Sequence, residues 1–144
     1  MGLDQYAYVA AKAGVRDDYW AGVELNPETG NYFNPTVNEP MEIAYWRKHP
    51  NLQGWMEELW IKKGRPGVDP SDAERSFNCI ELELTWNDLD DLERAVRARI
   101  LPETTGFFFG RNSDDEYYEQ DLEFIKNAKA EIFLGLKVFY NSSW

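Results

Sequence analysis

The sequence predicts a single α+β domain over residues 1–144, in which a small, mostly antiparallel sheet is covered by three to four helices. Three observations predict this fold class. Segments with the two-residue alternation of half-buried strands are interleaved with segments that carry the spacing of amphipathic helices. Hydrophobic residues make up 43% of the chain, which suffices for a packed core at this length. No internal repeat or low-complexity tract divides the sequence.

The expected strands are short. A first strand covers 3–11, where tyrosines fall on one face, and the clearest strand covers 77–85, where glutamates alternate with apolar residues. Between 23 and 33, two short apolar segments flank an Asn-Pro turn signal, which indicates a hairpin or an ordered connecting loop. The phenylalanine run at 106–110 is either a buried strand or a tight loop. The pattern leaves the strand order open.

Residues 41–63 are predicted to be mostly helical. Pro50 lacks an N–H and clashes with a preceding helical turn, so we expect a break near His49 and a second helix from about Asn51, with Gly64 as its stop. The stretch that follows is rich in charge, proline and glycine and is expected to be a loop. Apolar residues of the second helix have the spacing of a buried stripe: Leu52, Trp55, Met56, Leu59 and Trp60.

Two further helices begin at capping-box signals. Thr85 precedes the first, with Asp88 three residues later, and an apolar stripe continues to Ile100 before Pro102. Its acids lie early and its arginines late, as the helix dipole favours. A second box at 113–116 predicts the start of the last helix. The apolar tail after this helix either continues it or packs back on the body.

The charge balance excludes several classes of function. Fifteen Lys and Arg against 26 Asp and Glu give a net charge of −11, which repels nucleic acid and anionic membranes at long range. No apolar run is long enough to span a bilayer, and the start lacks the pattern of a signal peptide. The single cysteine, Cys79, excludes an internal disulfide and suits a reducing compartment. We therefore expect a cytoplasmic protein with no direct nucleic-acid or membrane partner.

The sequence contains no recognisable catalytic constellation. His49 and Cys79 are each alone in type, so a zinc site would need carboxylate ligands, and no metal or other cofactor is predicted. The chain has no Gly-x-Ser-x-Gly elbow, phosphate-binding loop or Gly-x-Gly-x-x-Gly motif. No catalytic residue is assigned, and the balance favours a protein that is not an enzyme.

The strongest chemical signal is a basic, aromatic corner in an acidic chain. Between 42 and 66 there are five Lys and Arg against three Asp and Glu, whereas 69–93 holds nine acids and one arginine. Rings beside a guanidinium can stack a base or hold an anion; the alternative is that the rings pack in the core while the cations are solvated or paired. The candidate ligand-binding residues are Tyr6, Tyr45, Trp46, Arg47, Lys48, His49, Phe108 and Tyr117.

A set of short motifs runs through most of the chain, apart from the stretches 17–40 and 64–77. They are Met1-Gly2-Leu3-Asp4 with Tyr6; Glu42-Ile43-Ala44-Tyr45-Trp46-Arg47-Lys48 with Asn51 and Trp55; Glu83-Leu84-Thr85 with Asp88-Leu89; and Gly106-Phe107-Phe108-Phe109-Gly110 leading to Glu116-Tyr117-Tyr118 and Asp121-Leu122. Together they resemble a family of small uncharacterised bacteriophage and prophage proteins. The resemblance implies a small accessory phage protein that acts in the host cytoplasm.

Two functions follow from these observations. The first is a non-enzymatic binding protein for a host or phage macromolecule, whose acidic runs at 69–93 and 114–123 face a basic protein. The second is a site for a small, nucleotide-like anion, either a binding protein or an enzyme, around Trp46, Arg47 and the loop of Phe107 to Phe109. The oligomeric state is not set by the sequence.

Overall fold

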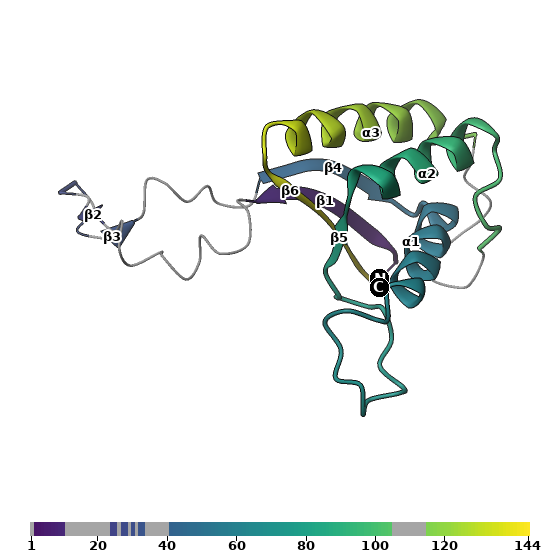
Figure 1. The fold of residues 1–144 in the computed structure, drawn as a ribbon, viewed down its shortest axis with the longest axis horizontal. Helices are drawn as coiled ribbons and strands as arrows, with labels where there is room; N and C mark the ends of the chain where they lie inside the picture. The colour runs from purple at the N-terminus through teal and green to yellow at the C-terminus, as the bar shows by residue number, and fades with distance from the viewer. Residues whose placement is uncertain are drawn as a thin grey trace.

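The computed structural model describes residues 2–10, 24–25, 27–28, 30, 32–33, 41–104 and 115–144. Four strands form one antiparallel sheet in the order β4-β1-β6-β5, and β2 and β3 form a separate hairpin. The α+β prediction is confirmed (Figure 1). The elements are β1 (Asp4–Ala10), β2 (Glu24–Leu25), β3 (Tyr32–Phe33), β4 (Met41–Arg47), α1 (Pro50–Lys62), β5 (Leu82–Leu84), α2 (Trp86–Arg97), α3 (Tyr118–Phe133) and β6 (Lys137–Ser143).

The helices α1, α2 and α3 lie on the same side of the four-stranded sheet, as Figure 1 shows. We call this the covered face and the opposite side the open face. Alternate residues of β1 and β6 are buried on the covered face, while the residues between them are only half-buried on the open face. The core fills the space between sheet and helices, and its largest fully buried side chains include Trp46, Phe77, Phe124 and Tyr140.

The C-terminal tail forms the strand β6 in the middle of the sheet. Gly135, with a φ of 94°, ends the turn after α3, a conformation that glycine adopts without steric cost. β6 then pairs with β1 from Lys137 opposite Ala10 to Ser143 opposite Asp4. Of the two alternatives for the tail, packing back on the body is therefore the one that the structure adopts.

The predicted helix at the start of 41–63 is wrong, because residues 41–47 form the strand β4. A register shift opposite Ala7 and Tyr8 breaks the two-residue alternation, so both Ile43 and Ala44 pack against the core. This bulge hides the strand pattern in the sequence. The alternation returns only in the last three residues of β4, Tyr45 to Arg47, which are exposed, buried and exposed in turn.

α1 begins at Pro50, where the sequence predicted a helix break. Proline suits the first helical position because its missing N–H has no partner there in any case. Leu52, Met56 and Trp60 of the expected stripe are fully or almost fully buried, and its other two members pack partly against the core. Gly64, with a φ of 86°, follows the end of α1 as expected.

The capping box of α2 is confirmed. Thr85 accepts a hydrogen bond from the backbone N–H of Asp88, whose carboxylate accepts one from the backbone N–H of Thr85. Lys63 also donates to this carboxylate, which ties the end of α1 to the start of α2. Burial opposes ionisation of Asp88, yet these hydrogen bonds lower the pKa of its carboxyl overall. The helix ends at Arg97, so the placement of Ile100 in its buried stripe is wrong; that side chain is 69% exposed.

The remaining predictions divide between corrected and confirmed. α3 starts at Tyr118 after an N-cap, Tyr117, that makes no side-chain capping bond, so the predicted box at 113–116 does not cap it; residues 113 and 114 lie outside the described part of the chain. The strand expected over 77–85 is shortened to β5. The hairpin is confirmed by the pairing of β2 with β3. The run 106–110 lies outside the described residues. Within the described ranges no helix has the length and apolar character to cross a membrane.

Candidate functional site

A polar network is buried on the covered face around the carboxylate of Asp121, a residue of α3. One carboxylate oxygen accepts a hydrogen bond from the indole Nε1 of Trp46 at 2.9 Å, and the other lies 2.7 Å from Nε2 of His49. The side chains of His49 and Asp121 are 0% and 1% exposed. The ring of Tyr117 stacks on the imidazole with the ring centroids 4.6 Å apart, which covers the histidine from the α3 side.

A second part of the network joins β1 to β6 and to the start of α1. The side-chain amide of Gln5 accepts from the backbone N–H of His49 at 2.8 Å and donates to the carbonyl of His49 at 2.9 Å. Gln5 also donates to the hydroxyl of Tyr140 at 3.0 Å, and this hydroxyl in turn donates to Gln53. Burial raises the pKa of Tyr140, so its hydroxyl stays protonated and can donate.

This network has the geometry of a structural centre. Because the imidazole and the carboxylate are both enclosed, neither touches solvent from which a substrate could arrive. Among the described residues, no group of three or more His, Cys, Asp and Glu is placed to hold a metal ion. The network instead links β1, β4, β6, α1 and α3 through directional bonds, which fixes how they meet.

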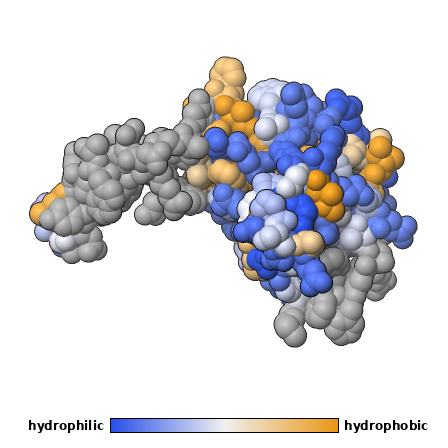
Figure 2. Space-filling model, turned by 60° about the horizontal axis from the view of Figure 1, so that its bottom comes forward, coloured by the Kyte–Doolittle hydropathy of each residue, from blue (hydrophilic) through white to orange (hydrophobic). Residues whose placement is uncertain are grey.

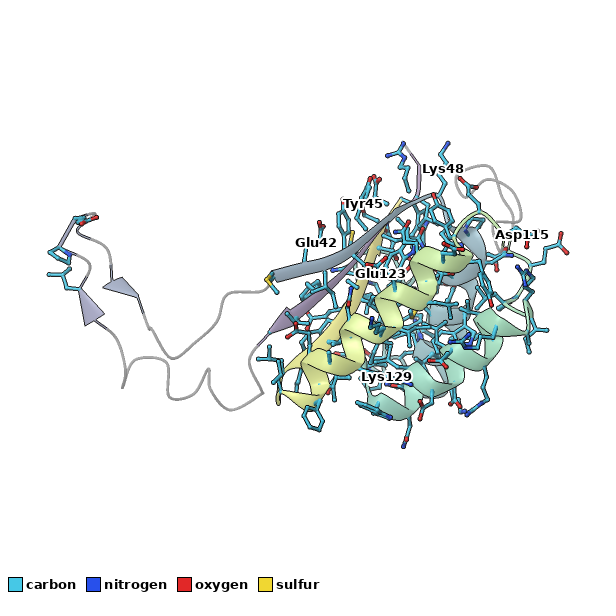
Figure 3. The ribbon with its side chains drawn as sticks, turned by 90° about the horizontal axis from the view of Figure 1, so that it is seen from above. Glu42, Tyr45, Lys48, Asp115, Glu123 and Lys129 are labelled. Atoms are coloured by element: carbon cyan, nitrogen blue, oxygen red, sulfur yellow. The ribbon has the colours of Figure 1, made fainter. Side chains whose placement is uncertain are left out.

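The structure divides the residues of the predicted ligand site between the two faces. Trp46 and His49 are fully buried in the network, and Tyr117 is half-buried above it. Tyr45 and Lys48 are exposed, and in Figure 3 Glu42, Tyr45 and Lys48 follow one another from one end of β4 to just beyond the other, on the side away from α3.

The other members of that set lie elsewhere. Arg47 projects on the open face and pairs with Asp4 at 2.8 Å, while Tyr6 is half-buried there. Phe108 lies outside the described residues. The structure thus brings Tyr6, Tyr45 and Arg47 together on the open face.

The open face carries rows of side chains that run across the strands. Cross-strand partners in an antiparallel sheet project from the same face. One row consists of Glu42, Tyr8, Phe139 and Glu83, from β4, β1, β6 and β5 in turn. The rings of Tyr8 and Phe139 stack with centroids 5.6 Å apart and planes at 27°. The row therefore has a carboxylate at each end and two packed rings between them.

A second row lies beside the first and is also aromatic. Tyr45, Tyr6 and Asn141 occupy opposite positions on β4, β1 and β6. The rings of Tyr6 and Tyr45 are 5.2 Å apart and tilted at 48°. The third row brings Arg47 opposite Asp4. Hydrogen bonds from Tyr45 and Arg47 lower the pKa of Asp4, so this carboxylate is ionised and its charge is matched by the guanidinium.

Two carboxylates on the open face remain without a cation in the described part of the chain. Glu83 is paired with Lys137 at 3.5 Å, and Asp4 is paired with Arg47. Glu42 and Glu81 have no such pair, although the hydroxyl of Tyr8 donates to Glu81. Burial and this negative neighbour raise the pKa of Tyr8, which keeps the hydroxyl protonated.

These two carboxylates line a hollow of about 530 Å³ on the open face. Its volume falls within the range of ligand pockets in proteins. The exposed Cys79, just before β5, stands at its border. The lining residues are Tyr6, Tyr8, Glu42, Cys79, Glu81, Asn141, Ser142 and Ser143.

A larger hollow of about 880 Å³ lies between α2 and α3 on the outside of the helix layer. Two of its cations are paired within the protein, Arg97 with Glu93 and Lys129 with Asp90, whereas Lys126 and Glu123, which also line it, have no ion pair among the described residues. Exposed apolar side chains such as Phe133 border it. On the side of the molecule seen in Figure 2, hydrophobic residues form separate islands in a mostly hydrophilic surface. The charged residues that line this groove are of both signs, so it does not favour a partner of one charge.

Sequence reasoning missed most of the residues of the open-face hollow. It singled out Tyr6, but Glu42 entered only a predicted helix and a family motif, and Tyr8 and Glu81 entered only strand patterns. The alternation of tyrosines in β1 with that of glutamates in 77–85 was the available signal, because both mark residues that share a sheet face.

No family model matches this chain, and neither the curated proteins nor the solved structures contain a match.

Proposed function

We propose that this protein is a non-enzymatic binding protein that holds a basic segment of a partner protein on its open sheet face. The observation that carries the proposal is the pair of carboxylates, Glu42 and Glu81, that border a tyrosine-lined hollow without a matching cation among the described residues. A cationic side chain of a partner would supply the missing charge. The net charge of −11 draws such a partner in at long range and repels phosphate-rich polymers.

The aromatic rings of the hollow support the same partner chemistry. A cation is attracted to the face of a tyrosine ring, by about 0.5–1 kcal/mol at an exposed site. Tyr6 and Tyr8 are half-buried and held by packing against Tyr45 and Phe139, so they lose little freedom when a partner binds. The surface thus combines fixed rings with unmatched negative charge.

A small anionic ligand around Trp46 and Arg47 has less support. The indole of Trp46 is fully buried and its N–H is bonded to Asp121, so the ring offers no face for stacking. The guanidinium of Arg47 is matched by Asp4, and an incoming anion would have to displace that carboxylate. The contribution of Phe107 to Phe109 stays a prediction.

The resemblance to phage and prophage proteins supports a partner in the host cytoplasm, either a protein of the phage or one of its host. A nucleic-acid-binding protein would present the kind of basic surface that the open face fits. Binding to such a surface would occupy residues that otherwise contact phosphates, and no chemical step is involved.

The test is binding of three fluorescent probes, measured by anisotropy at low and high salt. The probes are a decapeptide of alternating Arg and Leu, its counterpart of alternating Glu and Leu, and a single-stranded oligonucleotide. We expect only the basic peptide to bind, and to bind more weakly as salt shortens the Debye length to about 3 Å near 1 M. Binding of the acidic peptide or the oligonucleotide in preference to the basic one would contradict the proposal.

Paired variants separate the open face from general electrostatics. The double variant Glu42→Gln/Glu81→Gln removes two negative charges from the hollow, whereas Glu58→Gln/Glu123→Gln removes two from exposed positions on α1 and α3. We expect the first double variant to weaken binding of the basic peptide about tenfold, because two charge-assisted contacts are lost. We expect the second to weaken its binding about twofold or less. An equal loss of affinity in both double variants would show that the peptide responds only to the net charge of the protein, and it would remove support for this site.

A further inference from the structure

We propose that the open face recognises an extended segment with the pattern basic-x-apolar-x-basic, lying across the strands. This inference rests on the proposed function and names the partner sequence that the site takes. Its basis is the row Glu42, Tyr8, Phe139 and Glu83, which crosses all four strands with a carboxylate at each end and two stacked rings in the middle.

The spacing of the row matches that of an extended peptide. Neighbouring strands lie about 4.8 Å apart, so β4 and β5, on opposite edges of the sheet, are separated by roughly 14 Å. In an extended segment, residues i, i+2 and i+4 project to one side and span about 13 Å. Basic residues at i and i+4 therefore reach the two ends of the row while residue i+2 lies over the rings.

The charges at the two ends support a basic residue at each. At the β4 end, the exposed Glu42 makes no ion pair with a described side chain. At the β5 end, Glu81 is likewise without an ion pair there, and Glu83 stands on the same face two residues later. Lys137 matches only Glu83, at 3.5 Å, so one negative charge is left over at this end.

The middle of the row favours an apolar residue. Tyr8 and Phe139 stack on each other, and the hydroxyl of Tyr8 is engaged by Glu81. The ring surfaces between the carboxylates therefore present carbon, and an apolar side chain over them gains from being removed from water. A peptide with its two basic residues adjacent would engage one end only and leave the rings uncovered.

The test uses three peptides with the same neutral Gly-Ser flanks and blocked ends. The first contains Arg-Ser-Leu-Ser-Arg, the second contains the same residues as Arg-Arg-Ser-Leu-Ser, and the third replaces Leu by Ser. We expect the first to bind about threefold more tightly than the second, since one exposed ion pair contributes up to about 1 kcal/mol. We expect the third to bind about fivefold more weakly than the first, because partial burial of leucine is lost.

Cys79, the single cysteine, reports whether the peptides occupy the proposed place. It is exposed and borders the hollow at the β5 end, so a bound peptide should slow its alkylation by iodoacetamide. Glu42→Gln should reduce the affinity for the first peptide. The second peptide should still bind at the β5 end of the row and should still slow the alkylation of Cys79. Glu58→Gln serves as the matched control and should change neither.

The outcomes separate the two proposals. Equal affinity for the first and second peptides, with Cys79 protected by both, would overturn the pattern and leave a basic-segment site in place. Absence of binding by all three at low salt, or binding without protection of Cys79, would overturn the proposed function itself.

Discussion

The two faces of the sheet use polar groups in opposite ways. On the covered face, Asp121 satisfies both His49 and Trp46, and Gln5 bonds the backbone of the same histidine. On the open face, Glu42 and Glu81 are held beside fixed rings without a cation from the described chain. The hydrogen bonds of the covered face therefore fix how the elements of the protein are oriented, whereas the open face has negative charge that is available to a partner.

This difference follows from the cost of burial. A buried carboxylate without partners is strongly destabilising, so Asp121 is retained only with its donors in place. A carboxylate at the surface is hydrated, so the lack of a paired cation destabilises the fold little. Glu42 can therefore stay unpaired until a partner binds. Residues of similar chemistry thus have structural or recognition roles according to the side of the sheet on which they lie.

The largest expected effect tests the covered face. Asp121→Ala removes the buried carboxylate that bonds the N–H of Trp46 and the imidazole of His49, and we expect the free energy of unfolding to fall by about 3–5 kcal/mol. Urea denaturation followed by tryptophan fluorescence measures it. Asp121→Asn keeps the shape and one acceptor and should cost less. Asp91→Ala, which removes an exposed carboxylate paired with Arg94, is the control and should change stability by about 0.5 kcal/mol or less.

A smaller effect tests how tightly the covered side is packed. A Cβ on Gly54, in α1, would stand 1.9 Å from Oγ1 of Thr104, which cannot be accommodated without displacement. We expect Gly54→Ala to cost about 1–3 kcal/mol, although alanine favours the helix. Thr104→Ala removes the clashing oxygen and should restore part of the loss in the double variant. On the open side, Ala10→Val should change stability by about 0.5 kcal/mol or less. The denaturation midpoints would contradict this account if the double variant lost as much stability as the two single variants, Gly54→Ala and Thr104→Ala, lose together.

The smallest effect concerns protonation on the open face. Hydrogen bonds from Tyr45 and then Arg47 lower the folded-state pKa of Asp4. Its stabilisation is therefore complete above the unfolded value of about 3.9 and is lost as the pH falls through the lower folded-state pKa. A titration of the carboxyl carbon by NMR should give a midpoint below that value, and Tyr45→Phe and Arg47→Met should each raise it. Midpoints unaffected by both changes would remove these contacts as the cause.

Local signals were sufficient where the structure depends on neighbours in the sequence. The capping box of Thr85 and Asp88 is made by hydrogen bonds within three residues, and the apolar spacing of α1 repeats within a single helix, so both were predicted correctly. The strand β4 was mistaken for a helix because its bulge removes the alternation that marks a strand. Its identity comes from pairing with β1, about forty residues earlier.

The residues of the buried network and of the open-face row could not be predicted from local sequence patterns, for a related reason. Gln5 and His49 lie 44 positions apart, and His49 and Asp121 lie 72 apart. Nothing in the sequence near Asp121 distinguishes it from the solvated acids of the same segment. The open-face row likewise depends on register among four strands, which the alternation of each strand alone does not set.

The position of β6 between β1 and β5 has a consequence for synthesis of the chain. β1 emerges from the ribosome first among the described elements, yet one of its two neighbours in the sheet ends at Ser143. Until that segment is translated, β1 has one unpaired edge and β5 has no partner at all. Completion of the sheet is therefore expected to follow translation of nearly all 144 residues, with a slow, long-range closing step that local helix formation cannot replace.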